Sequence, residues 1–329
     1  MFLISVEDLE IGDILLTAES SSISKAVRLS TKSQYSHAIL YVGHSSYIHS
    51  DSNGVHSGNL QRLLFPLQKN VCVLKVNCGH EQKEKACIFA RDKIGTEYSV
   101  KEAISSRLYP NKDVMQNRQF CSRLVAQAYE YANVKLVENS SFCTPQEILE
   151  SSYTLSTSII ARKASEAEII FATKTHDPIK KQSEITNKIL EDVRALTKKD
   201  IQTLNQVHEF LMSFPEYDSE ISAIYKESGY LDMWRYEVRK NKWRYSCELF
   251  SKLGISPSEL KELALSENKS AKGRMRLYSS NYNQYLYLRS QYELEYLDIH
   301  IELYKNLIDF TTKNINASLY VLSMLEKNI

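Results

Sequence analysis

The glycines of this chain are concentrated in its first third. Six of the nine glycines lie at positions 12, 43, 54, 58, 79 and 95, and none occurs between residues 96 and 228. Glycine supplies the backbone angles that tight turns and hairpins require. The distribution therefore predicts β-structure in the first third of the chain and helices in the rest.

Hydrophobic patterns in residues 1–160 predict a mixed domain. Short runs rich in β-branched residues predict strands, and a period of three to four predicts helices. The predicted strands are residues 13–17, 37–43, 46–50 and 71–77, and the predicted helices are residues 81–94 and 120–133. The stretch 100–118 is expected to be an irregular polar loop. We therefore expect an α+β domain over residues 1–160.

Residues 161–329 predict an all-α domain. Ser256, Pro257 and Glu259 form a helix-start signal. From 278 to 327 there is no proline or glycine, and tyrosines and aliphatic residues recur at spacings of three, four or seven. This pattern predicts one amphipathic helix of about 50 residues. Its expected partners are helices at 182–212 and 217–250, in an antiparallel bundle or a coiled-coil hairpin that could also bind a protein partner or self-associate.

The composition of the chain argues against several classes of protein. The 41 basic and 40 acidic side chains nearly cancel, so no global charge favours nucleic acid or an anionic membrane. No segment approaches the ~20 apolar residues of a membrane-spanning helix. The apolar start of the chain is interrupted by Glu7 and Asp8 and has no basic region, so it does not predict a signal peptide. We expect a cytoplasmic protein, unless a dedicated secretion system exports it.

Neither the cysteines nor the histidines predict a metal site or a cofactor. The six cysteines lie at positions 72, 78, 87, 121, 143 and 247, without the paired spacing of a zinc site or a disulfide framework. The eight histidines include no H-E-x-x-H pattern. His44 and His56 occur in turn-like surroundings and are expected to face solvent.

One cysteine and one histidine form a candidate catalytic pair. Cys121 opens the helix predicted at 120–133, and His37 opens the strand predicted at 37–43. A thiol is nucleophilic as the thiolate, and both a helix N-terminus and a nearby imidazole lower its pKa. Backbone N–H groups at the same helix start could hold an oxyanion. The pattern is therefore that of a cysteine nucleophile with its general base, although each residue taken singly is more commonly structural.

A third group is needed to orient the base, and His49 is the main candidate. A two-residue turn at 44–45 would place His49 opposite Leu40, on the face away from His37. A bulge or a one-residue shift would place it opposite Tyr41, on the face of His37. Asp51 is the alternative third residue.

Several short motifs resemble the circularly permuted NlpC-type papain-like hydrolases, and most closely the YaeF/YiiX group, which is related to lecithin retinol acyltransferase. The motifs fall within residues 8 to about 155, in the order and approximate spacing of that family. They are Leu9–Leu16, Tyr35–Gly43, Gly54–Val55, Phe120–Val125 and Thr144–Leu149.

The resemblance implies a small antiparallel sheet packed on helices, with Cys121 as nucleophile and His37 as base. It implies a third polar residue on the next strand, a position that His49 matches, and it suggests Tyr98 and Tyr35 as substrate-lining residues. The implied substrates are peptide amides or lipid acyl groups, cleaved as an amide, ester or thioester by hydrolysis or acyl transfer. Two alternatives remain open: a catalytically degenerate papain-like module in a helical scaffold protein, and an exported effector or toxin.

Overall fold

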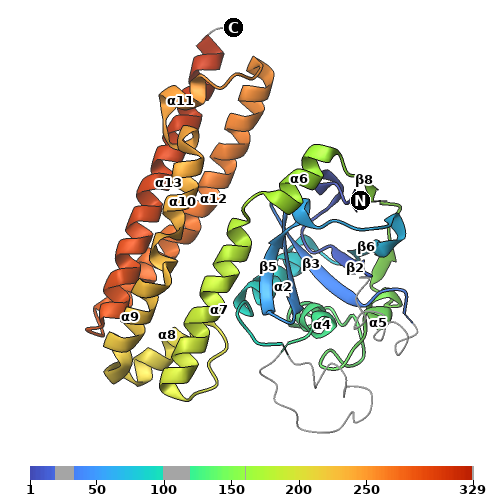
Figure 1. Ribbon diagram of the computed structural model, residues 1–329, viewed down its shortest axis with the longest axis horizontal. Coiled ribbons are helices and arrows are strands. Elements are labelled where there is room, and N and C mark those ends of the chain that lie inside the picture. The colour runs from blue at the N-terminus through green and yellow to red at the C-terminus, as the bar shows by residue number, and fades with distance from the viewer. Residues whose placement is uncertain (19–32, 99–118, 160, 328–329) are drawn as a thin grey trace. The chain divides into compact units, whose positions relative to one another are not determined.

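The computed structural model describes residues 1–18, 33–98, 119–159 and 161–327, so the loop predicted at 100–118 lies outside the described residues (Figure 1). The chain divides into two compact units. The first comprises residues 1–190 and 198–207, and the second comprises residues 191–197 and 208–329. All the strands of the described residues belong to the first unit, while the second is built from helices. This division confirms an α+β fold followed by a helical region.

A six-stranded antiparallel sheet forms the centre of the first unit. Its strand order is β5-β4-β3-β2-β6-β7. The strands are β2 (Ile14–Thr17), β3 (His37–Gly43), β4 (Ser46–Asp51), β5 (Gly54–Asn59), β6 (Val71–Val76) and β7 (Thr154–Ser156). A separate pair joins β1 (Phe2–Leu3) to β8 (Arg162–Lys163). The four strands predicted from the sequence are therefore confirmed, whereas β5 and the short strands were not predicted.

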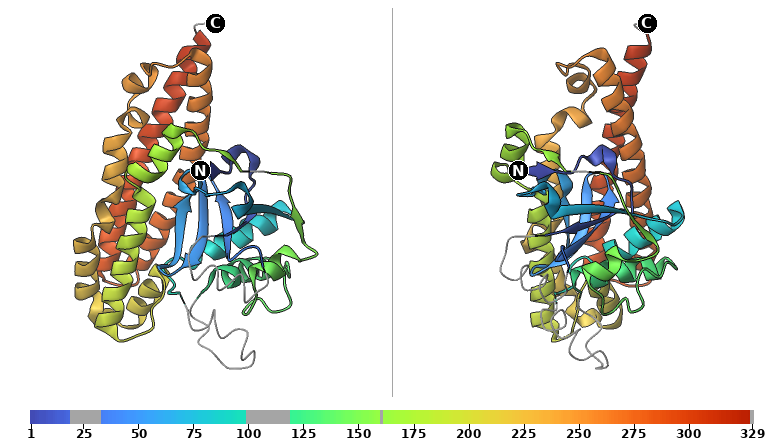
Figure 2. Two further views of the ribbon diagram at one scale, coloured as in Figure 1. Left: turned by 45° about the vertical axis from the view of Figure 1, so that its right-hand side comes forward. Right: turned by 90° about the vertical axis from the view of Figure 1, so that its right-hand side faces the viewer.

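Each face of this sheet is covered by its own hydrophobic cluster, because successive side chains of a strand point to opposite faces. On one face, Leu16 and Leu40 pack with side chains of α2 (His80–Asp92) and α4 (Cys121–Tyr131), and these helices lie along the sheet in Figure 2. On the other face, Leu15 and Ile39 pack with Tyr41, Tyr47 and Phe65. The helices predicted at 81–94 and 120–133 are thus confirmed as the layer that covers the first face.

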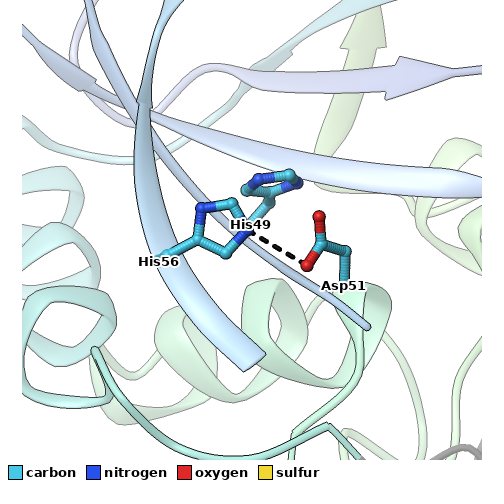
Figure 3. Close-up of side chains that lie close together, drawn as sticks. All are labelled: His49, Asp51 and His56. Carbon is cyan, nitrogen blue, oxygen red and sulfur yellow. Dashed lines mark ion pairs between the residues drawn. The ribbon is translucent and has the colours of Figure 1, made fainter. Parts of the chain in front are cut away.

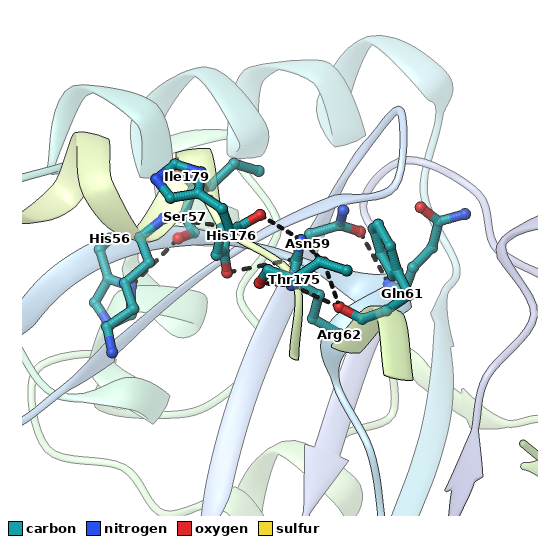
Figure 4. A network of polar contacts seen from close by, with 11 residues as sticks. His56, Ser57, Asn59, Gln61, Arg62, Thr175, His176 and Ile179 are labelled. Atoms are coloured by element: carbon teal, nitrogen blue, oxygen red, sulfur yellow. Dashed lines mark hydrogen bonds and ion pairs between the residues drawn. The ribbon is translucent and has the colours of Figure 1, made fainter. Parts of the chain in front are cut away.

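Helix α6 (Glu166–Lys174) is fastened to the first unit by Arg62, the last residue of the 3-10 turn η2 (Leu60–Arg62) (Figure 4). The guanidinium donates to the carbonyls of Phe171 at 2.8 Å, Thr175 at 3.1 Å and His176 at 2.7 Å. It also lies 4.3 Å above the ring of Phe171. One side chain thereby satisfies carbonyls that the end of a helix leaves unpaired, and α6 belongs to the first unit although it follows the boundary predicted at 160–161.

The remaining elements are helical and mostly belong to the second unit. The helices are α5 (Pro145–Leu149), α7 (Pro178–Thr197), α8 (Leu204–Ser213), α9 (Asp218–Ser228), α10 (Met233–Lys240), α11 (Cys247–Ser251), α12 (Pro257–Arg289) and α13 (Glu295–Lys327). Helix α12 begins at the predicted start signal, where Ser256 and Glu259 form a capping box and bond each other's backbone N–H groups. No helix among the described residues has the length and apolar character needed to span a membrane.

The prediction of one helix from 278 to 327 is wrong, because the chain breaks at residues 290–294 and returns as α13. Helices α12 and α13 pack along each other as the main pair of the second unit. The carboxylate of Asp218 in α9 accepts the backbone N–H groups of Glu295 at 2.6 Å and Tyr296 at 2.9 Å, which caps the new helix. Its first turn thus begins where a distant side chain satisfies its free donors.

Candidate active site

Cys121 is the first residue of α4, and the first turn of this helix is held by the chain that follows it. The hydroxyl of Ser122 donates to the carbonyl of Cys143 at 2.6 Å, and Arg123 donates to the carbonyl of Ser141 at 2.8 Å. Phe120, the residue before the helix, makes no side-chain cap. The side chain of Phe120 therefore does not cap the N–H groups of the first turn. These groups lie at the positive end of the helix dipole, which favours an anion.

The thiol of Cys121 is buried, and this burial decides its protonation state. Loss of solvent raises the pKa of Cys121, while the backbone N–H groups of Ala38 and Ser122 act in the opposite direction. The lowered pKa expected for a cysteine at a helix N-terminus is therefore not what the structure gives. At neutral pH the resting group is a thiol, and its proton must leave when the sulfur attacks.

His37 and His49 meet directly. Nε2 of His37 lies 2.7 Å from Nδ1 of His49, and the two rings are nearly perpendicular. Burial lowers the pKa of His37 to about 4, and burial together with the His37 imidazole lowers the pKa of His49 well below its usual value. Both rings are therefore neutral near pH 7, and each has one nitrogen that carries a proton and one that can accept one.

A β-bulge brings His49 to the face of His37. Gly43 pairs with Ser46, but the register then shifts, so that Tyr41 pairs with Tyr47 and Leu40 with Ile48. Continuing this register places His49 beside Ile39. The bulged alternative is thus confirmed for the face, but the expected neighbour Tyr41 is wrong by two residues because the bulge consumes an extra residue of β3.

The thiol of Cys121 lies against the strand that carries His37. The sulfur of Cys121 accepts hydrogen bonds from the backbone N–H groups of Ser122 and of Ala38, the residue after His37, while the His37 side chain bonds His49. Hydrogen bonds between catalytic groups commonly tighten only when substrate binds. The structure therefore joins His37 to His49 directly, and it places Cys121 against the backbone of the residue that follows His37.

Comparison with known proteins relates the N-terminal part of the chain to a described family. The family described as "permuted papain-like amidase enzyme, YaeF/YiiX, C92 family" matches residues 8–165. Residues 8–165 are a domain of this family. No curated protein matches the chain. A similar solved structure is the "metalloprotein yiiX from Escherichia coli O157:H7", with 18% sequence identity, 46% of this chain and 97% of that chain covered, and a TM-score of 0.31.

The match to the papain-like amidase family confirms the resemblance and makes the chain an enzyme of the cysteine hydrolase type. The aromatic residues that the resemblance suggested lie in different surroundings. Tyr98 forms an isolated β-bridge with Gln119, and burial together with the Cys121 thiol raises its pKa. Tyr35 is buried in the core between the sheet and α4, and burial and Cys72 raise its pKa to about 12. Tyr98 is thus the one of the two that neighbours the candidate nucleophile.

Asp51, the alternative third residue, pairs with His56 instead of His37 (Figure 3). The distance from Asp51 Oδ1 to His56 Nε2 is 3.1 Å. Burial alone would raise the pKa of Asp51, but the hydrogen bond from His56 lowers it strongly overall. The structure therefore brings His49, and not Asp51, to the candidate base.

His56 is the functional candidate that the sequence analysis missed. It is half-buried on β5, directly opposite His49, and the two ring centres are 4.3 Å apart, so the expectation that it faces solvent is wrong. His44, by contrast, is exposed in the turn as predicted. The sequence carried a signal for the pairing. A two-residue Ser52–Asn53 turn before Gly54 is a hairpin pattern, and its register sets His49 against His56.

Proposed function

We propose that the N-terminal domain hydrolyses an amide bond through a covalent thioester on Cys121, with His37 as general base and acid and His49 as the residue that orients His37. The observation that carries the proposal is the 2.7 Å contact between His37 Nε2 and His49 Nδ1, with the thiol of Cys121 at a helix N-terminus and hydrogen-bonded to the backbone of Ala38, the residue after His37. This is the arrangement of a nucleophile, a base and an orienting group.

The tautomers follow from the contact. If His37 donates from Nε2 to Nδ1 of His49, its own Nδ1 keeps a lone pair and can accept the thiol proton. The sulfur of Cys121 then attacks the carbonyl carbon, and the N–H groups of the first turn of α4 stabilise the oxyanion. The His37 imidazolium gives its proton to the leaving amine. Water, deprotonated by His37, attacks the thioester, and the acid and the free thiol are released.

A neutral thiol and a neutral imidazole suit this sequence of steps. Because burial raises the pKa of Cys121 and lowers that of His37, the resting site is uncharged and proton transfer accompanies attack. The peptide or lipid acyl nature of the substrate, and recognition of a protein partner by the helical unit, stay predictions of the sequence.

The test is a screen of peptide and fatty-acyl amides, together with matched esters, on the full-length chain, with the acyl-enzyme detected by intact mass. Wild type should accumulate or turn over an acyl adduct on Cys121, and Cys121→Ala should form none. His37→Ala and His49→Ala should each lower kcat/KM by roughly 10²- to 10⁴-fold, the range of a positioned base and its orienting partner.

His44→Ala is the matched control, because it removes an exposed histidine of the same hairpin and should leave kcat/KM unchanged. Full turnover by Cys121→Ala would refute the proposal. Faster turnover of the matched ester with no cleavage of any amide would refute the choice of bond.

A further inference from the structure

Three potential metal ligands converge near the turn of the β4–β5 hairpin. His49, Asp51 and His56 each offer one ligand atom, and these atoms all lie within 4.8 Å of one another (Figure 3). Asp51 and His56 are already 3.1 Å apart. A tetrahedral ion with bonds of about 2.0 Å needs ligand atoms a little over 3 Å apart, so modest side-chain rotations close the set.

Each of the two imidazoles directs a suitable nitrogen to this point. Nδ1 of His56 lies 3.3 Å from the carbonyl of Ser57, which favours a proton on Nδ1, and Nε2 faces the Asp51 carboxylate at 3.1 Å, where a cation would replace the proton shared between them. A carbonyl behind a ligating histidine is the usual outer partner in protein metal sites. Nε2 of His49 is buried and has no hydrogen-bond partner among the described residues. A buried nitrogen without a partner is costly, and a cation at this point would satisfy it.

The site also has an approach from solvent. The side chain of Asp51 is 35% exposed and that of His56 is 18% exposed, whereas His49 is buried behind them. An ion held by these three ligands would keep a fourth position for water. Two imidazoles and one carboxylate suit a borderline cation such as Zn²⁺ better than Mg²⁺ or Ca²⁺, which prefer oxygen ligands.

We propose that His49, Asp51 and His56 bind a divalent cation of the Zn²⁺ type, and that the bound ion prevents His37 from acting as a base. An ion on Nε2 of His49 requires the proton of this ring to be on Nδ1. That N–H then donates to Nε2 of His37, across the 2.7 Å contact. His37 carries its own proton on Nδ1 and has no lone pair left for the thiol proton.

The cation site is inferred from the geometry of its three ligands alone. The effect of the ion on His37, in contrast, rests on the proposed function. The two tautomeric states of the His37–His49 pair exclude each other, so the ion and the active base cannot coexist. The ion would thus be an inhibitor that acts through His49 without contact with the sulfur.

Binding is tested by titrating Co²⁺, as a spectroscopic probe, into the metal-free full-length chain. We expect one ion per chain and visible d–d absorption without a thiolate-to-cobalt charge-transfer band. Cys121→Ser should bind as wild type does. His56→Ala and Asp51→Asn should weaken binding by more than the roughly 10- to 100-fold that loss of an outer partner costs. His44→Ala, the matched control in the turn before the other end of β4, should bind normally.

The effect on the site is tested by the rate at which iodoacetamide alkylates Cys121 at fixed pH. Saturating Zn²⁺ should slow wild type by roughly tenfold or more, within the contribution of a positioned base, and should not slow His56→Ala. Binding that is indifferent to His56, or a thiolate charge-transfer band, would overturn the site. Binding that leaves alkylation unchanged would overturn the coupling to His37. If His37→Ala alkylates as fast as metal-free wild type, the proposed function fails, whereas the binding result is unaffected.

Discussion

Tyr47 packs its ring directly against Gly58 on the neighbouring strand, and the same ring meets the imidazole of His49 edge-on at 5.1 Å. A Cβ at position 58 would overlap the Tyr47 ring. The glycine therefore sets where the tyrosine lies, and the tyrosine in turn supports the residue that orients the candidate base.

Gly58→Ala should thus impair the site from a position that contacts no catalytic group. Displacing Tyr47 should cost about 1–3 kcal/mol of stability, as overpacking of a core does, and should lower turnover because His49 loses its support. Thermal unfolding and kcat/KM measure the two effects. Gly273→Ala is the control. Position 273 has open space around it in α12, so a helical alanine there should stabilise by roughly 0.5–1 kcal/mol. If Gly58→Ala unfolds at the same temperature as wild type, the Tyr47 ring can move aside without a cost in stability.

The reactivity of Cys121 should rise with pH through the neutral range. Burial raises the pKa of this thiol, so the thiolate is the minor form at pH 7 and its fraction grows about tenfold per pH unit until the pKa is reached. Alkylation rates of Cys121, followed by peptide mass spectrometry between about pH 6 and pH 9, should show no plateau below pH 8. The same peptide in denaturant gives the rate of the unburied thiol. A rate that is already constant near pH 6 would indicate a resting thiolate–imidazolium pair instead.

Arg62→Ala should release α6 from the first unit. The substitution removes three hydrogen bonds to carbonyls and the contact with Phe171. Hydrogen exchange should therefore show faster exchange across residues 166–177, with α4 unchanged. Arg62→Lys should not restore protection, since an ammonium cannot span several carbonyls as a planar guanidinium does. Normal protection of residues 166–177 in Arg62→Ala would mean that other contacts hold α6.

Asp218→Ala should destabilise the start of α13. The substitution removes the two hydrogen bonds from the N–H groups of Glu295 and Tyr296. The loss of a helix cap typically lowers the free energy of unfolding by about 1 kcal/mol. Hydrogen exchange at the first turn of α13 and thermal unfolding measure the loss. Glu220→Ala removes an exposed acid of the same helix and should have little effect. Equal effects of the two substitutions would indicate that the negative charge of α9, and not the cap made by Asp218, stabilises the start of α13.

The elements with local signals were predictable from the sequence. Strands β2, β3, β4 and β6, helices α2 and α4, and the Ser256 capping box arise from side-chain periodicity and short-range hydrogen bonds, which are encoded in neighbouring residues. The candidate residues were chosen from local signals as well, because Cys121 and His37 open their elements and lie in motifs within residues 8–165, the range that matches the family.

Only the tertiary structure decided how these residues meet. The bulge in β3 set the face of His49, and the β4–β5 register set His56 against it. Burial reversed the expected pKa shift of Cys121, because desolvation depends on everything packed around the sulfur. After the break at residues 290–294, the start of α13 is likewise capped by Asp218, more than seventy positions away in sequence. Local pattern determines which elements form. Registers, distant caps and solvent exclusion depend on contacts between segments that no local pattern encodes.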